Sequence, residues 1–339
     1  MSAEEMPLLR ETGSPASADN NPPTGGGCQL PQNIGHRGYK AAFPENTMAA
    51  FRGAVAAGAH AIETDLHLSR DGVAVLSHDA TLKRCFGIDK KIADCDWEYL
   101  RTLQTVQRPC QGMPRLADLL EWLAQPGLES VWVLLDIKLD DDPELLLAAI
   151  ARAVGSENYV HLARALLPSF PLAYIGFSLV YAKRFLSDAH PDVHFNLFQP
   201  VLVGPLGARF RREVRRRGRR LFVWTVNDEQ WMRWSCRKGV DAVVTDEVGR
   251  FADVRDGLDQ ESVGGSDGGA GEGKMVAVAR NRRRGDVGGP LLRKVGLYVK
   301  AFVLQGAALL FTVLLWHRLS TRGAMGRRRL KGKPVLDKT

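Results

Sequence analysis

Short apolar runs of β-type residues alternate with helical stretches between residues 31 and 253, and this alternation constrains the fold more than any other feature. Such alternation is typical of a parallel sheet with helical crossovers. We count about eight candidate strands, the number that a closed parallel barrel needs. They are Asn33–Gly35, Ala61–Leu66, Val73–Leu76, Val131–Ile137, Ala173–Phe177, Val193–Leu197, Leu221–Val226 and Ala242–Thr245. A (β/α)8 barrel takes roughly 250 residues. The chain of 339 residues is therefore expected to be an α/β protein with one (β/α)8 TIM barrel over residues 31–255.

Three stretches between these strands carry small and apolar residues at helical spacing. They are Thr47–Ala57, Leu116–Leu123 and Glu144–Val154, and Pro143 is well placed as the first residue of the last helix. The second and third strands differ, because only the tight turn Ser69–Gly72 joins them. We therefore expect a hairpin at this point, and a barrel that is less regular than an ideal one.

The segments that flank the barrel have a different composition. Residues 1–30 are polar, rich in Ser, Pro and Gly, and lack the apolar core of a signal peptide, so we expect a disordered arm. Residues 256–290 are centred on the run Gly264–Gly269 and are expected to be a flexible linker.

The C-terminal region contains an apolar run of twenty residues, 297–316, whose only charge is Lys300. A helix of about twenty apolar residues can cross the core of a bilayer. Tyr298 and Trp316 lie near the ends of the run, where interfacial aromatic residues are common. We expect a C-terminal transmembrane or membrane anchor helix here, followed by a basic tail at residues 317–339. A buried helix, or one in the plane of the membrane interface, is the alternative.

The formal net charge of +8 favours an anionic partner, and an anionic phospholipid in a membrane is the partner expected. Eight of the twelve residues in Arg209–Arg220 are arginine, which suits either the solvated face of an outer helix or a patch that attracts acidic lipid. No stacking aromatic residues interleave with these arginines, so nucleic acid is not expected as a partner.

The five cysteines show no zinc-type spacing and are expected to be free thiols in a reducing compartment. A large N-terminal domain before a C-terminal span suggests a catalytic domain that faces the cytosol. The endoplasmic reticulum, the mitochondrial outer membrane and the lipid droplet surface remain open as its location.

Carboxylates cluster at the ends of two candidate strands. Glu63 and Asp65 are two residues apart on one strand, so both side chains point to the same face. Paired oxygen ligands suit a hard divalent cation, Mg²⁺ or Ca²⁺. Glu45 and Asp136 are candidates to complete the set of ligands, and Glu45 is also a candidate contact to the substrate. An ion pair between Asp136 and Lys138, which follows on the same strand face, is the structural alternative.

Two histidines follow the first and third candidate strands. His36 and His78 should therefore open on the same end of the barrel, where two imidazoles can act as general base and general acid. Arg37 offers a planar fork of donors to phosphate oxygens. Trp224, near the end of the seventh strand, suits either a pocket wall or the core. His60 and His67 flank the carboxylate pair and are assigned no role.

The combined pattern resembles the glycerophosphodiester phosphodiesterase family over about residues 31–250. The matching motifs are HRG at 36–38, PENT at 44–47, ExD at 63–65, DG at 71–72, HD at 78–79, DIK at 136–138, WTVN at 224–227 and VTD at 244–246. This resemblance implies a TIM barrel that hydrolyses phosphodiesters of glycerol with a divalent metal. It implies His36 and His78 as the acid and base, and Glu63 and Asp65 as metal ligands. Arg37 and Lys138 would contact the phosphate.

The sequence departs from the family at one position, because many members carry Glu where this chain has Asp136. The shorter side chain makes the third metal ligand less certain than the other two.

A narrower resemblance is to fungal phosphatidylglycerol-specific phospholipase C, through Phe195–Gln199, Val203–Pro205, the LLDIK strand and the C-terminal apolar run. It implies cleavage of phosphatidylglycerol to diacylglycerol and glycerol phosphate. The alternative is a glycerophosphodiesterase or lysophospholipase D that acts on glycerophosphodiesters or lysolipids. A non-enzymatic membrane scaffold is not expected, because the carboxylate set is nearly intact.

Overall fold

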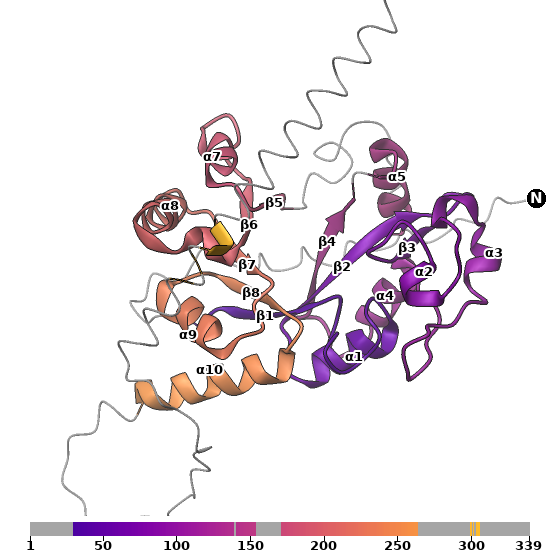
Figure 1. Ribbon diagram of the computed structural model, residues 1–339, viewed down its shortest axis with the longest axis horizontal. Coiled ribbons are helices and arrows are strands. Elements are labelled where there is room, and N and C mark those ends of the chain that lie inside the picture. The colour runs from indigo at the N-terminus through magenta and orange to yellow at the C-terminus, as the bar shows by residue number, and fades with distance from the viewer. Residues whose placement is uncertain are drawn as a thin grey trace, which may run out of the picture.

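The computed structural model describes residues 30–138, 140–153, 171–263, 299, 301 and 303–305. Its central element is a parallel sheet in the order β5-β6-β7-β8-β1-β2-β4 (Figure 1). The eight strands are β1 (Gln32–His36), β2 (Ala61–Leu68), β3 (Ala74–Leu76), β4 (Trp132–Ile137), β5 (Ala173–Gly176), β6 (His194–Phe198), β7 (Leu221–Trp224) and β8 (Ala242–Thr245). All eight coincide with strands expected from the sequence.

The expectation of a regular closed barrel of eight parallel strands is corrected in one respect. β3 runs antiparallel to β2 and pairs with its last residues, Leu66 to Leu68, while β4 takes the next parallel position beside β2. The hairpin predicted at Ser69–Gly72 is thus confirmed, and it removes β3 from the parallel set. Among the described residues, β4 and β5 share no strand pairing, so the sheet is barrel-like and open between them.

Helices follow most of the strands and cover the outside of the sheet (Figure 1). The barrel helices are α1 (Met48–Ala56), α4 (Leu116–Leu123), α5 (Pro143–Ala153), α7 (Leu179–Ala182), α8 (Gly204–Arg216), α9 (Glu229–Lys238) and α10 (Val248–Val263). The shorter ones are α2 (Lys83–Phe86), α3 (Trp97–Leu100) and the 3-10 turns η1 (Ile92–Asp94), η2 (Lys183–Leu186) and η3 (Gln199–Leu202). The helices expected at Thr47–Ala57, Leu116–Leu123 and Glu144–Val154 are confirmed within one residue over the described positions.

Burial explains why β2 lies at the centre. Every residue of β2 is buried, as expected for a strand covered on both faces. Inside the curve of the sheet, Trp132 and Phe222 meet at 5.8 Å between ring centroids, within an apolar cluster that includes Ile34. This layer fills the interior below the carboxyl ends of the strands, so those ends hold the accessible chemistry.

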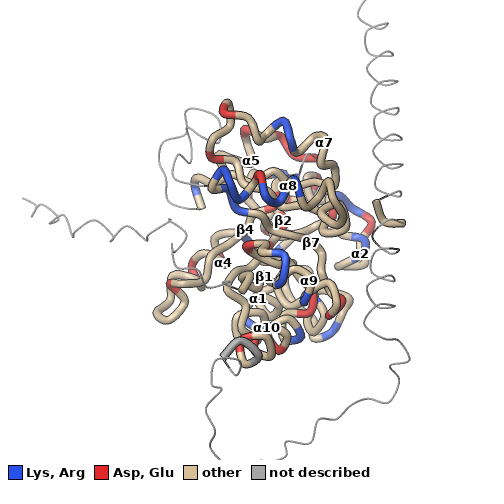
Figure 2. Tube along the Cα trace, turned by 90° about the vertical axis from the view of Figure 1, so that its left-hand side faces the viewer, with Lys and Arg blue, Asp and Glu red and all other residues tan. Residues whose placement is uncertain are grey.

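The arginine-rich segment lies along α8 and the turn that leads into β7, and Figure 2 shows blue segments beside α8. Arg219 is buried and donates to the backbone oxygen of Val193 at 2.9 Å, and Arg215 donates to that of Gly239 at 2.9 Å. Arg217 pairs with Glu213. These arginines therefore hold the amino-terminal ends of strands, which supports the structural alternative for them.

The predicted membrane helix at residues 297–316 falls mostly outside the described residues. Within those that are described, no helix has the length and apolar character needed to span a bilayer. The flexible linker expected at residues 256–290 is corrected at its start, because helix α10 continues to Val263. The arm at residues 1–29 and the remainder of the expected linker, from residue 264, lie outside the described part.

Candidate active site

Three carboxylates meet at the carboxyl ends of β2 and β4. Strand register aligns Asp65 with Asp136. Glu63 lies two residues before Asp65 on β2 and therefore on the same face of the sheet. One oxygen of each of the three side chains lies within 4.8 Å of the others. Glu63 and Asp65 are 5% and 1% exposed. The sequence-predicted ligands Glu63, Asp65 and Asp136 are thus brought together in one cluster, in which Asp136 is half-buried.

The loop after β1 builds the wall of this cluster. The backbone N–H of Arg37 donates to Glu63 Oε2 at 2.9 Å, and Asn46 Nδ2 donates to Asp65 Oδ2 at 3.0 Å. Arg37 and Asn46 both have positive φ, 56° and 53°, which side-chain-bearing residues adopt infrequently. Gly38 has φ 81°, and a Cβ there would lie 2.6 Å from the Ala50 carbonyl carbon, so only glycine fits beside α1.

Two cations compensate the cluster. Lys138 Nζ lies 2.6 Å from Asp65 Oδ1 and 2.7 Å from Asp136 Oδ2, while Arg37 Nε lies 3.3 Å from Asp65 Oδ2. The ion pair offered as the alternative for Asp136 and Lys138 therefore exists, and it forms part of the same site. Lys138 thus contacts two of the three carboxylates that would hold a metal ion.

The electrostatics of the cluster fit a divalent cation. Burial, reinforced by the neighbouring Asp65 and Asp136, raises the pKa of Glu63 well above its usual value. Burial also opposes ionisation of Asp65, but Lys138 and Arg37 outweigh it and lower the pKa of that group. Three oxygen donors with an energetically costly buried charge match the ligand set of a hard cation such as Mg²⁺ or Ca²⁺.

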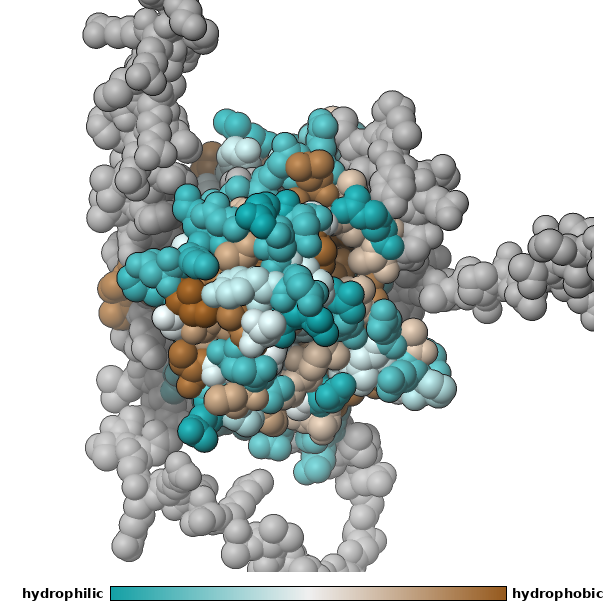
Figure 3. Space-filling model, turned by 90° about the vertical axis from the view of Figure 1, so that its right-hand side faces the viewer, coloured by the Kyte–Doolittle hydropathy of each residue, from teal (hydrophilic) through white to brown (hydrophobic). Residues whose placement is uncertain are grey.

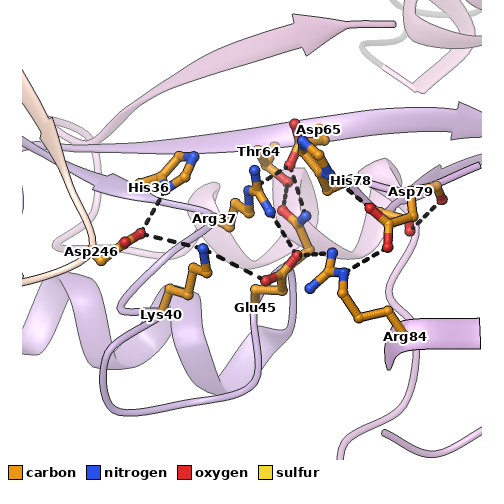
Figure 4. Close-up of polar contacts among 12 residues, drawn as sticks. His36, Arg37, Lys40, Glu45, Thr64, Asp65, His78, Asp79, Arg84 and Asp246 are labelled. Atoms are coloured by element: carbon orange, nitrogen blue, oxygen red, sulfur yellow. Dashed lines mark hydrogen bonds and ion pairs between the residues drawn. The ribbon is translucent and has the colours of Figure 1, made fainter. Parts of the chain in front are cut away.

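His36 ends β1 and is held by a carboxylate that directly follows β8, the strand paired with β1 (Figure 4). Its Nδ1 lies 2.6 Å from Asp246 Oδ1, and the other oxygen of Asp246 accepts from Asn227 Nδ2 at 2.7 Å. Burial opposes ionisation of Asp246, but the contact with His36 and the charge of Lys40 lower its pKa. This contact fixes the ring and leaves Nε2 as the nitrogen that can exchange a proton with a substrate.

His78 follows β3 and has a similar partner. Its Nδ1 lies 2.8 Å from Asp79 Oδ1, and Arg84 Nε donates to Asp79 Oδ2 at 2.6 Å. Arg84, assisted by His78, lowers the pKa of Asp79 to about 2. Each predicted catalytic histidine is therefore oriented through Nδ1 by its own aspartate.

Glu45 lies between the two histidine loops, as Figure 4 shows. Its carboxylate accepts from Arg37 at 2.9 Å and from Arg84 at 2.7 Å, and Lys40 lies 3.9 Å away. Burial opposes its ionisation, yet the hydrogen bond from Arg84 and the charge of Arg37 lower its pKa. The structure thus places Glu45 among cations and outside the carboxylate cluster, although the sequence made it a candidate ligand.

Trp224 is half-buried at the end of β7. Its ring packs against Phe198 with centroids 5.6 Å apart, and its Nε1 donates to the Asn196 carbonyl at 3.0 Å. It belongs to the interior cluster and lies at its upper margin, a placement that suits both interpretations made from the sequence. His67 pairs with Asp141 at 2.7 Å in a buried contact, which agrees with a packing position.

Four polar residues that orient the site received no role from the sequence: Lys40, Arg84, Asn227 and Asp246. Asn227 and Asp246 are the last residues of the WTVN and VTD motifs. Asp246 follows β8 directly, so the rule that placed His36 at a strand end could also have found it. Asn227 lies just beyond the end of β7 and is open to the same reasoning. Arg84 and Lys40 lie in connections, where no periodic signal marks them.

The sequence model of the Glycerophosphoryl diester phosphodiesterase family matches residues 36–150 and 179–250, just over half of the chain. Human Lysophospholipase D GDPD1 is 34% identical over 140 residues, which span 39% of this chain and 44% of that protein. The Probable glycerophosphodiester phosphodiesterase 2 of Mycobacterium tuberculosis is 29% identical over 249 residues, or 65% of this chain and 89% of the relative. A crystal structure of glycerophosphodiester phosphodiesterase from Thermotoga maritima aligns with TM-score 0.55 and 27% identity, covering 67% of this chain and all of that one.

Proposed function

The chain belongs to the glycerophosphoryl diester phosphodiesterase family, a family of phosphoric diester hydrolases, and we propose that it hydrolyses a glycerol-containing phosphodiester. The observation that carries this proposal is the arrangement of the site. A buried cluster of three carboxylates lies at the end of the sheet, with an aspartate-held histidine on β1 and another after β3. This arrangement supplies a cation site and two proton-transfer groups.

A divalent cation, Mg²⁺ or Ca²⁺, would be held by Glu63, Asp65 and Asp136. When bound, it would stabilise negative charge on the phosphoryl oxygens. Arg37 and Lys138 would contact the same phosphate, because both already lie against the carboxylate cluster. Oxygen ligands favour these hard cations over zinc.

The two histidines divide the proton transfers. One histidine takes the proton from the glycerol hydroxyl next to the phosphoester, and that oxygen attacks phosphorus. The other histidine gives its proton to the leaving alcohol as the bond from phosphorus to the alcohol oxygen breaks. Water then opens the resulting cyclic phosphate with the histidine roles exchanged. Each such transfer contributes about 10²–10⁴-fold to the rate.

The substrate that we favour is phosphatidylglycerol, cleaved to diacylglycerol and glycerol phosphate. The apolar run at 297–316 supports a membrane-bound enzyme with a cytosol-facing catalytic domain. The endoplasmic reticulum, the mitochondrial outer membrane and the lipid droplet are its candidate locations. A second candidate is a lysophospholipase D or glycerophosphodiesterase that acts on lysolipids or glycerophosphodiesters, which the names of the human and mycobacterial relatives favour.

Product analysis of the purified full-length chain tests these proposals. Phosphatidylglycerol vesicles, a lysophospholipid and glycerophosphocholine are each incubated with Mg²⁺, Ca²⁺ or EDTA. Release of diacylglycerol from phosphatidylglycerol supports the phospholipase C reaction. Release of lysophosphatidic acid from the lysophospholipid supports the lysophospholipase D reaction. Turnover of glycerophosphocholine only, with release of glycerol phosphate, supports a glycerophosphodiesterase.

Two variants test the histidine roles. His36→Ala and His78→Ala should each abolish nearly all turnover, whereas His190→Ala, away from the site, should retain it. Near-normal activity in either of the first two variants contradicts the assignment.

A further inference from the structure

Exposed large apolar side chains are distributed unevenly over the two ends of the sheet. Val180 and Tyr181 in α7 directly follow β5, and Leu206 at the start of α8 follows β6. Val180 is 78% exposed and Leu206 is 71% exposed. In the described part of the chain, no exposed large apolar side chain lies in the few residues that immediately precede β2, β4, β6, β7 or β8. Val180 and Leu206 therefore lie on the connections that leave the carboxyl ends of β5 and β6, the end of the sheet that carries the candidate active site.

The beginning of the C-terminal apolar run is attached at this end. Ala301 is 1% exposed and belongs to the same core cluster as residues of η3. Gln305, one helical turn later, donates through Nε2 to the carbonyl of Pro200 at 2.7 Å and of Val203 at 3.3 Å. A run long enough to enter a bilayer is thus attached beside the carboxyl end of β6.

Other apolar side chains of this helical piece are exposed to solvent. Val299, Val303 and Leu304 are exposed, while Ala301 and Gln305 face the domain. Figure 3 views the molecule from the side of α3 and α5, away from α7 and α8; hydrophilic residues predominate there, and the brown, hydrophobic patches lie mainly toward the left-hand edge. α7 and the C-terminal piece pack on one continuous core cluster, which contains Ala182 and Ala301.

Basic residues follow the apolar pair of α7. Lys183 and Arg184 in η2 are exposed, and the guanidinium carbon of Arg184 lies 5.1 Å from the centre of the Tyr181 ring. Tyrosine beside long cationic side chains is a combination found at bilayer interfaces, where the ring and the methylene stems enter the boundary and the charges meet lipid head groups. Lys183 and Arg184 therefore give this surface a charge complementary to that of an anionic membrane.

We propose that α7, η2, the start of α8 and the described C-terminal residues 299, 301 and 303–305 form a lipid-docking rim that presents the active site to an anionic bilayer. This inference rests on the proposed hydrolysis of a lipid phosphodiester and identifies the surface through which the lipid is reached. The apolar run that continues from the rim favours a bilayer over a second copy of the chain. A lipid phosphodiester has its scissile bond at the head group, so the rim brings the interface level with the carboxylates and histidines.

The test compares substrate in vesicles with substrate in solution. Two full-length variants, Val180→Ser/Tyr181→Ser and Lys183→Glu/Arg184→Glu, change only exposed or half-exposed positions. A matched control, Arg237→Glu/Lys238→Glu, reverses two charges at the C-terminal end of α9, toward the opposite end of the sheet. Binding is measured by flotation with phosphatidylcholine vesicles that contain phosphatidylglycerol, and turnover with the same vesicles and with glycerophosphocholine.

We expect both rim variants to lose about tenfold or more in vesicle binding and vesicle turnover, because two interfacial contacts are removed in each. Turnover of glycerophosphocholine should be unchanged, and the control should match the unmodified chain. Normal vesicle binding by both rim variants overturns the proposal, as does a rim variant that instead loses self-association in sedimentation. Vesicle binding without turnover of any phosphodiester leaves the rim in place and refutes the proposed function instead.

Discussion

The contact between His36 and Asp246 makes Asp246→Asn the most informative single substitution. Asp246 accepts two hydrogen bonds, one on each oxygen, from His36 and from Asn227. Asparagine has nearly the same shape but offers only one oxygen acceptor. The variant therefore must give up the contact with His36 or the contact with Asn227, and it also loses the negative charge beside the imidazole.

The expected magnitude follows from the kind of hydrogen bond that is lost. The contact measures 2.6 Å and is mostly shielded from solvent, with His36 and Asp246 side chains 14% and 20% exposed. A hydrogen bond to a charged group contributes about 1.5–3 kcal/mol. At about 1.4 kcal/mol per factor of ten, this corresponds to a loss of roughly 10–150-fold in kcat. KM should change little, because Asp246 orients His36 and has no contact with the carboxylate cluster.

Steady-state kinetics on the substrate identified by the product analysis measure both constants. The exchange variant Asn227→Asp/Asp246→Asn places a carboxylate at position 227. This carboxylate can accept from the new amide at position 246, whose oxygen is then free for His36. We expect the exchange variant to regain most of the lost kcat, which a general loss of folding would not allow. A kcat of Asp246→Asn within about threefold of the unmodified chain, or a loss confined to KM, refutes the positioning role.

Three further outcomes follow from the charges of the site. In EDTA, Lys138→Met should lose about 3–5 kcal/mol of unfolding free energy, because Asp65 and Asp136 lose the ammonium group that they share. Saturating Mg²⁺ should restore most of this loss. Equal losses with EDTA and with Mg²⁺ contradict the prediction. The pKa of Glu63 is raised in the folded, metal-free protein, and this contributes stability that is fully present below the pKa of an unfolded glutamate, about 4.3. The contribution is lost as the pH rises through the pKa of Glu63 in the folded state. Denaturation in EDTA should therefore show Glu63→Gln gaining stability relative to the unmodified chain as pH rises, and parallel pH profiles exclude it. In Arg84→Met, the pKa of Asp79 should rise from about 2 toward its usual range in a carboxyl NMR titration. An unchanged pKa in this variant shows that Arg84 does not cause the lowered pKa of Asp79.

Local patterns were sufficient to locate every strand of the described sheet. The buried run of β2 and the alternating strands and helices carry that information in their own residues. The order of the strands was harder to predict, because pairing depends on partners distant in sequence. β4 pairs with β2 although a long insertion separates them, and the short helices α2 and α3 of that insertion show no amphipathic period of their own. Helices this short depend on tertiary contacts rather than on local propensity.

The site was predictable where its residues end strands and unpredictable where they lie in connections. Strand alternation placed Glu63 and Asp65 on one face, and register then brought Asp136 to them. Glu45 has the same chemistry as these ligands, but its loop turns it toward Arg37 and Arg84. The direction of a loop side chain depends on backbone conformations such as the positive φ of Arg37, which composition and periodicity do not specify.

The packing of charge in the site is itself an argument for a bound cation. Glu63, Asp65 and Asp136 hold their oxygens within 4.8 Å of one another, and the buried Glu63 has a strongly raised pKa even though Lys138 and Arg37 are present. A purely structural ion pair would need only Asp136 and Lys138, and adding two buried carboxylates beside it costs folding free energy. A divalent cation held by these three carboxylates would offset this cost. Lys138, which contacts Asp65 and Asp136, would then be available to a phosphate, so the same lysine can stabilise the metal-free site and contact the substrate.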